Sequence, residues 1–374
     1  MTPRAGAPVV LAAGGTGGHV FPAEALAGTL LDRGYRLALV TDRRGQAYGG
    51  TLGKLETHRV LAGGIAGRGP LAKVRALAEL GLGVVQARAL LSRLRPAAVL
   101  GFGGYASVPT MVAASLLGLP NAIHEQNAVL GRANRLLAAR VRRIATSYAQ
   151  VAHIDGRLAA KVVQTGMPVR PAVAALLGRP APALDEAGEI RLLVLGGSQG
   201  ARALSEVVPA ALAALAAPLR RRLAVSQQCR PEDLEEVRRA YGASGVNATL
   251  ESFFHDVPER MAAAHLVIAR SGASTVAELT TLGRPAILVP YPHAIDDHQT
   301  ANAHAVDEAG GAWLMPQASF TPGTLAARLD SLFTQPGTLA RAAACAHSVG
   351  RPDAAARLAD MVAALPATHQ EIHP

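Results

Sequence analysis

Aromatic side chains are scarce in this chain: phenylalanine, tyrosine and tryptophan make up 3% of its 374 residues, with a single tryptophan. Proteins that bind single-stranded nucleic acid stack bases on such rings, and no familiar nucleic-acid motif is present. We therefore expect no nucleic-acid partner, although the formal net charge is +10.

Cysteine and long apolar runs are also lacking. The two cysteines, Cys229 and Cys345, cannot form the framework of a disulfide-rich domain and do not have metal-ligand spacing, which fits a reducing cytosol. No secretory signal is expected, because residues 1–7 lead directly into the first apolar run. No uninterrupted apolar stretch reaches the roughly 18 residues of a spanning helix, so we expect none.

What the chain does contain is a globular composition, with 50% hydrophobic and 17% charged residues, and a length that predicts two domains. Apolar runs of strand length alternate with helix-forming stretches, which predicts an α/β protein of two Rossmann-like, doubly wound parallel-sheet domains. We expect strands at 9–13, 36–41, 57–61, 97–101, 121–124 and 143–145, and again at 191–195, 223–227, 248–251, 266–269, 285–289 and 312–314.

Two glycine-rich segments, about half a chain apart, each follow one of these runs. They are residues 14–19 (GGTGGH) and 196–201 (GGSQGA), with helix-forming stretches at 23–31 and 201–217 behind them. A strand, a glycine turn and a helix N-terminus together aim N–H groups and a positive dipole end at one point, which suits an anionic ligand. One such loop in each half predicts a ligand held in a cleft between the two domains.

Two further turns follow the same logic. Residues 101–107 (GFGGYAS) come after the run at 97–100, and residues 270–275 (RSGAST) come after 266–269 and lead into a helix that carries Glu278. A carboxylate at such a place can accept two hydrogen bonds from a ribose diol, as acidic residues do in other nucleotide sites. The alternative role of Glu278 is to interact with the helix dipole.

Positive charge is concentrated in the first half, where residues 1–165 contain 20 lysines and arginines against 7 aspartates and glutamates. An apolar patch rimmed by basic side chains is typical of proteins that bind an anionic membrane surface without spanning it. The alternative is an ordinary core face beside a solvated face. The interleaved residues are Arg68, Leu71, Lys73, Val74, Arg75, Leu77, Leu80, Leu82, Val85, Arg88, Arg93 and Arg95, with Arg132, Arg135, Arg140, Arg142 and Arg143 on a second helical stretch.

Seven segments between residues 14 and 303 occur in a familiar order: GGTGGHVFPA, GFGGYAS, HEQN, TGMPVR, GGSQGA, RSGASTVAE and DDHQTANA. This order resembles the MurG family of bacterial peptidoglycan glycosyltransferases. The resemblance implies an inverting transfer of N-acetylglucosamine from UDP-GlcNAc to the C4 hydroxyl of MurNAc in undecaprenyl-pyrophosphoryl-MurNAc-pentapeptide, the step from lipid I to lipid II.

The resemblance also implies the two-domain glycosyltransferase type B fold. Residues 1–166 would form an acceptor-binding and membrane-associating domain, and residues 167–348 a UDP-sugar-binding domain. The tail at about 349–374 would be a helix that packs back on the first domain. The protein would be peripheral, on the cytoplasmic face of the bacterial inner membrane, with other cell-wall synthesis proteins as further partners and a role in cell shape and division.

Two residues are candidates for the base that takes the proton of the acceptor hydroxyl. An imidazole with a pKa near neutrality suits that role, and His19 stands at the end of the first glycine loop, where members of the family also have a histidine. Its alternative role is to orient the loop. Glu125, at the end of an expected strand, is the second candidate, or else it fixes the loop, holds His19 or binds the acceptor sugar.

The resemblance extends to substrate contacts. Arg170 would lie at the nucleotide, or else form a salt bridge at a hinge, and Gln299 would bind hydroxyls of N-acetylglucosamine. The expected donor-site residues are Thr16, Gly17, Gly18, Asn127, Arg170, Ser198, Gln199, Gly200, Arg270, Ser271, Gly272, Ala273, Thr275, Glu278, His298, Gln299 and Asn302. The expected acceptor-side residues are Gly14, Gly15, Gly103, Gly104, Tyr105, His124 and Asn134.

No metal site and no obligatory cofactor are expected, because Asp296 and Asp297 do not form an Asp-x-Asp pattern after a strand. Three other functions stay open. A lipid glycosyltransferase with another UDP-sugar would share most of these loops, and a non-catalytic membrane scaffold could retain the fold. A dinucleotide-dependent oxidoreductase would explain the first loop and Asp42, but the spacing of residues 14–19 is not G-x-G-x-x-G.

Overall fold

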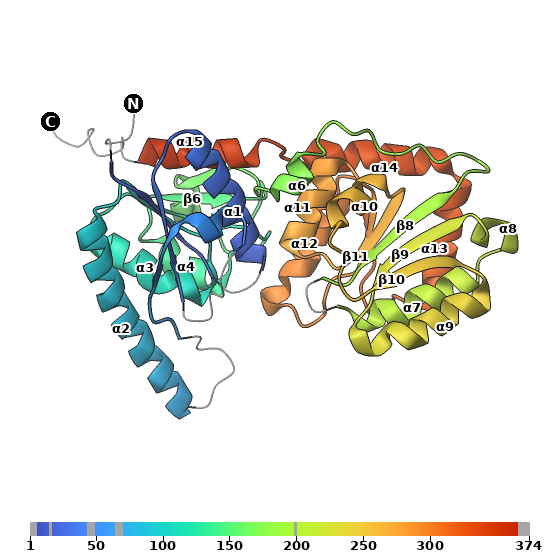
Figure 1. Cartoon of the computed structure of the whole chain (residues 1–374), viewed down its shortest axis with the longest axis horizontal. Coiled ribbons are helices and arrows are strands. Elements are labelled where there is room, and N and C mark those ends of the chain that lie inside the picture. Colours follow the sequence, from blue (N-terminus) through green and yellow to red (C-terminus); the bar gives the residue numbers. More distant parts are fainter. Residues whose placement is uncertain (1–5, 15–16, 43–48, 64–69, 198–199, 366–374) are drawn as a thin grey trace. The chain divides into compact units, whose positions relative to one another are not determined.

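The computed structural model describes residues 6–14, 17–42, 49–63, 70–197 and 200–365. The chain forms two compact units: unit 1 is Met1–Arg170 with Asp353–Pro374, and unit 2 is Pro171–Pro352. Each unit is a parallel sheet with helices on both of its faces (Figure 1). The predicted fold class, two doubly wound α/β domains, is therefore confirmed.

Unit 1 contains a seven-stranded parallel sheet. Its strands, in spatial order, are β3 (Glu56–Arg59), β2 (Leu37–Thr41), β1 (Val9–Ala12), β4 (Ala98–Gly101), β5 (Asn121–Glu125), β6 (Arg143–Thr146) and β7 (Val162–Gln164). Its α-helices are α1 (Gly17–Asp32), α2 (Pro70–Leu94), α3 (Gly104–Leu116), α4 (Arg132–Ala138), α5 (Gly156–Ala159) and α15 (Ala354–Ala364).

Unit 2 contains a six-stranded parallel sheet. Its strands, in spatial order, are β10 (Asn247–Glu251), β9 (Leu223–Gln228), β8 (Ile190–Leu195), β11 (Leu266–Ala269), β12 (Ala286–Leu288) and β13 (Ala312–Leu314). Its α-helices are α6 (Pro171–Ala174), α7 (Arg202–Ala213), α8 (Ala217–Arg220), α9 (Leu234–Ser244), α10 (Val257–Ala263), α11 (Ala273–Leu282), α12 (His298–Asp307), α13 (Pro322–Thr334) and α14 (Pro336–Val349).

The central strands of unit 1 are buried along their whole length, as their continuous apolar sequences require when helices cover both faces of a sheet. One face of the sheet packs on α1 and α15, and α15 lies beside α1 although more than 300 residues separate them (Figure 1). The other face packs on α2, α3 and α4. The last described helix of the chain therefore completes the core of unit 1.

The order of the strands reverses at one place in each sheet. β1 lies between β2 and β4, and β8 lies between β9 and β11, so consecutive crossovers from the central strand run to opposite sides. Ligands of open α/β sheets bind outside the carboxyl ends of the strands at such a switch point. The loops after β1 and β4, and those after β8 and β11, are the four glycine-containing loops that the sequence singles out.

All twelve predicted strands are present to within a few residues of their expected bounds, but three other features differ. The half-buried edge strand β7 was not predicted, because its three residues give too short a periodic signal. Helix α1 begins at Gly17 rather than Ala23 and includes Pro22. The stretch 201–217 is not one helix: α7 ends at Ala213 and α8 follows, where Pro218 restricts the residue before it.

Candidate functional site

The carboxyl ends of β1, β4 and β5 bring three predicted segments of unit 1 together. A Cβ on Gly14 would lie 2.7 Å from the Cβ of Ala106, so the loop after β1 packs directly on the start of α3. Gly103 and Gly104 both have positive φ (84° and 68°), and a Cβ on Gly104 would lie 3.2 Å from Cδ2 of His19. The glycine turn thus forms a close wall beside the imidazole of His19.

His19 lies in the first turn of α1, not at the end of an irregular loop as expected, and its side chain is half-buried. Its Nδ1 is 3.3 Å from Oε1 of Gln126, which is buried just after β5. Gln126 belongs to the HEQN segment but was not among the predicted site residues. Its role depends on a contact between segments 107 residues apart, which no local pattern reports.

Glu125 is the last residue of β5, at the strand end where it was expected, and it is 2% exposed. Its Oε1 accepts hydrogen bonds from the backbone and side-chain nitrogens of Asn127, at 3.0 and 3.3 Å. Its Oε2 accepts from the backbone nitrogen of Gly131 at 2.9 Å and from Nδ2 of Asn134 at 2.7 Å. In this structure the carboxylate therefore organises the segment from β5 to α4.

Two buried groups beside Glu125 complete this part of the site. Nδ2 of Asn134 also donates to the carbonyl of His124, while Oδ1 of Asn134 is buried without a partner among the described residues. His124 is fully buried, and desolvation lowers its pKa to about 4. An orphaned buried acceptor is what a ligand or a bound water would satisfy.

Arg170 and Tyr105 occupy half-buried positions in unit 1. The guanidinium carbon of Arg170 lies 5.3 Å from the centre of the Phe21 ring, so the arginine packs on α1 by a cation–π contact. Tyr105 is the second residue of α3 and follows the glycine turn. The predicted residues Gly15 and Thr16 lie outside the described residues; Gly17 and Gly18 open α1.

In unit 2, the loop after β8 carries the second glycine-rich segment. Gly197 and Gly200 have positive φ (81° and 71°), and a Cβ on Gly200 would lie 2.5 Å from Cγ of Arg230. Arg230 forms a bidentate pair with Asp233, at 2.6 and 2.8 Å, which lowers the pKa of the Asp233 carboxyl. Sequence reasoning missed this cation beside the loop. The predicted residues Ser198 and Gln199 lie outside the described residues.

The loop after β11 gathers more of the predicted residues. Arg270 is 9% exposed and donates to the carbonyls of Val289 and Pro290 and to Oε1 of Gln317, at 3.1, 2.9 and 2.6 Å. Its guanidinium lies 5.7 Å from the centre of the Tyr291 ring, and burial lowers its pKa. Arg270 therefore fixes the segment after β12, and Gln317, its partner, is a third residue that was not predicted from the sequence.

Ser271, Glu278 and Asn302 form the buried floor of this region, with exposures of 0, 4 and 0%. Nδ2 of Asn302, from α12, donates to the carbonyl of Ser271 at 3.1 Å. The hydroxyl of Ser271 is buried without a partner among the described residues. Gly272 caps α11, whose first turn contains the predicted residues Ala273 and Thr275.

The predicted donor-site residues His298 and Gln299 lie in a helix. His298 and Gln299 are the first two residues of α12, which begins after two consecutive residues with positive φ, Asp296 (54°) and Asp297 (50°). Oε1 of Gln299 accepts from the backbone nitrogen of Tyr291 at 2.9 Å, and Nδ1 of His298 lies 2.7 Å from the carbonyl of Ile295. The helix start thus points both side chains along the segment after β12.

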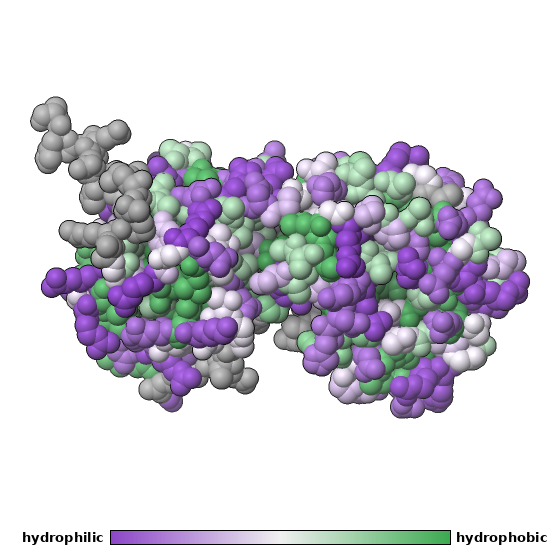
Figure 2. Space-filling view, turned by 45° about the horizontal axis from the view of Figure 1, so that its top comes forward, coloured by the Kyte–Doolittle hydropathy of each residue, from purple (hydrophilic) through white to green (hydrophobic). Residues whose placement is uncertain are grey.

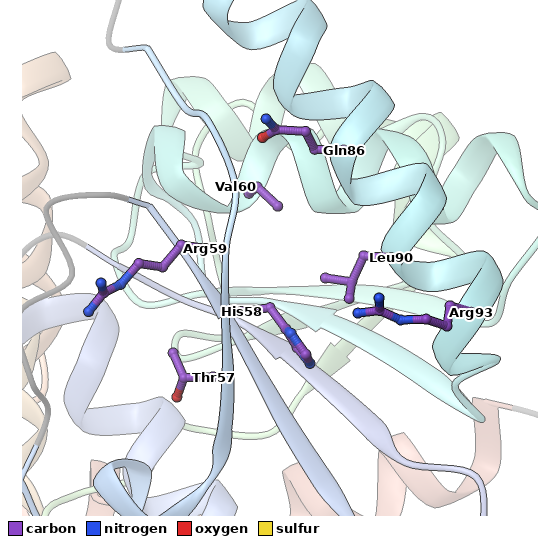
Figure 3. A pocket seen from close by; sticks show the side chains of 7 residues that line it. All are labelled: Thr57, His58, Arg59, Val60, Gln86, Leu90 and Arg93. Atoms are coloured by element: carbon purple, nitrogen blue, oxygen red, sulfur yellow. The ribbon is translucent and has the colours of Figure 1, made fainter.

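One cavity of unit 1, about 510 Å³ in volume, contains none of the predicted site residues. It lies between β3 and α2, where His58 and Val60 extend from the strand toward Leu90 and Arg93 of the helix, while Arg59 points to the opposite side of the strand (Figure 3). Among the described residues, no group of three or more His, Cys, Asp or Glu side chains has the geometry of a metal site.

Comparisons with known proteins agree with this arrangement. Residues 9–146 match the glycosyltransferase family 28 N-terminal domain, and residues 191–358 match the C-terminal domain of that family. The chain is 71% identical over 357 residues, 96% of each chain, to the UDP-N-acetylglucosamine–N-acetylmuramyl-(pentapeptide) pyrophosphoryl-undecaprenol N-acetylglucosamine transferase of Paramagnetospirillum magneticum. The protein of the same name from Rhodospirillum rubrum is 62% identical, over 95% of this chain and 91% of its own.

A solved structure gives the same result. The chain is similar to the crystal structure of Acinetobacter baumannii MurG, with a TM-score of 0.77 and 30% identity over 95% of this chain and 98% of that one. A UDP-GlcNAc 2-epimerase from Neisseria meningitidis, with a TM-score of 0.64 and 11% identity, shares the fold.

Proposed function

This chain belongs to glycosyltransferase family 28 and to its MurG branch, and from that membership we propose its reaction. The protein transfers N-acetylglucosamine from UDP-GlcNAc to the C4 hydroxyl of MurNAc in undecaprenyl-pyrophosphoryl-MurNAc-pentapeptide. The observation that carries this proposal is the 71% identity over 96% of a relative that is named for this reaction. Two doubly wound sheets in one chain also fit the type B glycosyltransferase fold.

His19 is proposed as the base. The C4 hydroxyl oxygen attacks the anomeric carbon of the sugar, its proton passes to the imidazole, and the bond from that carbon to UDP breaks with inversion. The position of His19, at a helix start beside the glycine turn after β4, supports this role. Glu125 has both oxygens occupied by N–H donors, which supports a positioning role for the carboxylate instead.

Departure of UDP requires stabilisation of negative charge on the diphosphate. The glycine loop after β8 leads into α7, whose N-terminal N–H groups and dipole suit an anion. Arg230 lies beside Gly200, but its guanidinium is paired with Asp233 and Glu232. The cation that we propose for the nucleotide is Arg170, which packs on Phe21. We propose that these groups take the place of a metal ion, so that the reaction needs no obligatory cofactor.

Recognition of the nucleoside and the sugar is assigned to the second half of unit 2. Glu278 is proposed to bind the ribose diol, and Gln299 to bind hydroxyls of N-acetylglucosamine, since an amide can donate and accept at once. The buried hydroxyl of Ser271, which has no partner among the described residues, supports a ligand in this region.

Unit 1 is proposed to bind an anionic membrane surface through α2. The inner face of this helix packs on the core through Ala76, Ala87 and Leu91, and its outer face exposes further apolar residues among charged ones. A patch of exposed apolar side chains commonly marks an interaction surface. The exposed outer residues are Val74 (66%), Leu77 (55%), Leu82 (57%) and Val85 (66%).

Basic residues accompany this apolar face, as binding to an anionic surface requires. Figure 2 shows hydrophobic residues lying between strongly hydrophilic ones on the surface of unit 1. Arg75, Arg88 and Arg93 of α2 are exposed among these apolar residues, and Arg93 also lines the cavity between β3 and α2 (Figure 3). Within the described residues, no helix has both the length and the apolar character needed to cross a membrane. The proposed location is the cytoplasmic face of the inner membrane.

The test is transfer of labelled N-acetylglucosamine from UDP-GlcNAc to a short-chain analogue of the lipid-linked muramyl pentapeptide, with and without EDTA. We expect equal product in both conditions. Product that disappears with EDTA and returns with added Mg²⁺ would contradict the metal-free mechanism. Binding of UDP-GlcNAc without any product would contradict the proposed acceptor.

A further inference from the structure

Gln126 lies between two histidines of unit 1, and its contacts form a continuous chain from His19 to the backbone of Gly166. We propose that Gln126 is a positioning residue that holds His19 in the tautomer with the proton on Nδ1, so that Nε2 is the nitrogen that accepts the acceptor's proton. This inference rests on the proposed function for its catalytic consequence, but the tautomer itself is a property of the protein without substrates.

The orientation of the Gln126 amide is fixed by two backbone carbonyls. Its Nε2 lies 2.9 Å from the carbonyl oxygen of Phe102 and 3.0 Å from that of His124. Carbonyl oxygens can only accept hydrogen bonds, so the amide nitrogen must occupy this end. The opposite orientation would place Oε1 against two carbonyl oxygens at 2% exposure, which is costly.

The orientation of the amide decides the protonation of His19. With Nε2 at the carbonyls, Oε1 of Gln126 faces Nδ1 of His19 at 3.3 Å. An amide oxygen has no proton to give, so Nδ1 of His19 must carry the proton and donate it. A neutral imidazole has only one N–H, and Nε2 of His19 is therefore the basic nitrogen.

His124 secures the other end of the chain. Its Nε2 lies 3.0 Å from the carbonyl oxygen of Gly166 and must donate to it. Its Nδ1 lies 3.1 Å from Nε2 of Gln126 and can only share one of the two amide protons that also reach the carbonyl oxygens of Phe102 and His124, an arrangement that requires Nδ1 to carry no proton. Burial lowers the pKa of His124 to about 4, so the ring is neutral at pH 7. Protonation of Nδ1 would instead place two donors face to face.

The arrangement has a consequence for the transfer step. When Nε2 of His19 takes the proton from the hydroxyl, the resulting imidazolium still donates through Nδ1–H to the Gln126 oxygen, so no group has to turn. Gly103 and Gly104 pack beside the ring, with Cδ2 of His19 3.2 Å from the position of a Cβ on Gly104. The ring is thus held both by its neighbours and by its hydrogen bond.

The test compares the wild-type protein with Gln126→Met, which keeps much of the side-chain volume and removes the acceptor oxygen. Nitrogen-15 NMR of the histidine-labelled full chain reads the tautomer of His19, identified by the signal that His19→Ala removes. We expect the Nδ1–H form in the wild type and a shift to the Nε2–H form in Gln126→Met. We expect kcat to fall about 10- to 100-fold with the donor KM within twofold, a part of what a general base contributes.

Asn121→Leu is the matched control, because Asn121 is a buried amide at the other end of the same strand, where Nδ2 bonds Ser115 and Oδ1 accepts from Arg142. It should reduce stability without changing the His19 tautomer or kcat.

An Nε2–H form of His19 in the wild type would overturn the proposal, and so would Gln126→Met with an unchanged tautomer. If Gln126→Met does not fold, the wild-type spectrum still decides. An inactive wild type would refute the proposed function, not the tautomer.

Discussion

At the scale of single residues, His19 and Glu278 should fail in different ways. His19→Ala removes the proposed base, which typically contributes 10²–10⁴-fold to the rate, so kcat should fall by about that factor with the donor KM nearly unchanged. Glu278→Ala removes hydrogen bonds to the proposed ribose diol, worth about 1.5–3 kcal/mol, so the donor KM should rise by about 10- to 150-fold. Steady-state kinetics with each substrate varied in turn measures both.

Glu278→Gln is the control for that pair, because it keeps the shape of the buried side chain, which is 4% exposed, and removes only its charge. Its donor KM should lie between those of the wild type and Glu278→Ala. Equal loss of donor binding in His19→Ala and Glu278→Ala would show that the two roles are wrongly assigned.

His124 should make the stability of unit 1 depend on pH. Its pKa is about 4 in the folded protein, whereas an exposed histidine in the unfolded chain has a pKa of 6.5. Between these two pH values the unfolded chain binds a proton that the folded chain does not. The free energy of unfolding should therefore rise by about 3 kcal/mol as the pH increases from 4 to 6.5. This contribution of His124 is lost again as the pH falls through the same range.

Urea unfolding of the wild type and His124→Gln at pH 7 and pH 4.5 measures this contribution. The difference between the two proteins should shrink as the pH falls, because only the wild type must protonate this ring on unfolding. His153→Asn controls for the loss of an exposed histidine in the same unit. A difference that does not change with pH would contradict the assignment.

Residues of the candidate site could be predicted from the sequence where they belong to a local motif. Glu125 was predicted at the end of a strand, and the structure confirms that it is the last residue of β5. Gln126, Arg230 and Gln317 were not found, because each acts through a partner or a turn that only the fold brings near. A glutamine beside a motif residue has no sequence signal of its own. The role of Gln126 follows from its 2.9 Å hydrogen bond to the carbonyl oxygen of Phe102, which only the folded structure shows.

At the scale of secondary-structure elements, the test concerns the outer face of α2. Leu77→Glu with Val85→Glu places two charges on the proposed membrane-binding face, at positions that are 55% and 66% exposed. Binding to vesicles that contain anionic lipid should fall at least about tenfold, because each apolar side chain contributes roughly 1.5–3 kcal/mol when buried. Sedimentation with vesicles measures the binding.

Leu177→Glu, at a 38% exposed apolar position of unit 2, is the matched control and should leave vesicle binding unchanged. Activity toward a short-chain acceptor in detergent-free buffer should also be unchanged in the α2 variant, since the substitutions face away from the core. Vesicle binding that survives both substitutions would show that another surface carries the association.

Secondary-structure elements could be predicted where the hydrophobic pattern of the sequence was long and uninterrupted. All strands with four or more buried residues were found, because apolar runs between turn residues are a strong signal. Helix α1 was placed too late, because Pro22 normally marks a helix start, whereas here the helix gives up one backbone hydrogen bond and begins at Gly17. The start of α12 was not predicted, since it follows Asp296 and Asp297, whose backbones have the left-handed conformation.

At the scale of the whole molecule, the chain crosses between its two units twice, and the last described helix belongs to the first unit. The side chains of α15 lie in the core of unit 1 rather than on its surface: Leu358 is 0% exposed, Met361 7%, Val362 1%, and Leu365, just beyond the helix, 2%. Each contributes up to about 1.5–3 kcal/mol by burial, an upper estimate since unfolded chains are partly collapsed.

Truncation after Pro352 should therefore unfold unit 1 while unit 2 stays folded. The apolar burial lost is comparable to the 5–15 kcal/mol that stabilises a typical domain, whereas the exposed ion pair between Arg33 and Asp360 contributes about 1 kcal/mol or less. Calorimetry of the truncated chain should show only the transition of unit 2, while Arg33→Ala, which removes the ion pair with Asp360 and a hydrogen bond to the carbonyl of Ala356, should retain both transitions. Two intact transitions in the truncated chain would mean that the core of unit 1 closes without α15, and the long return of the chain would then need a reason other than stability.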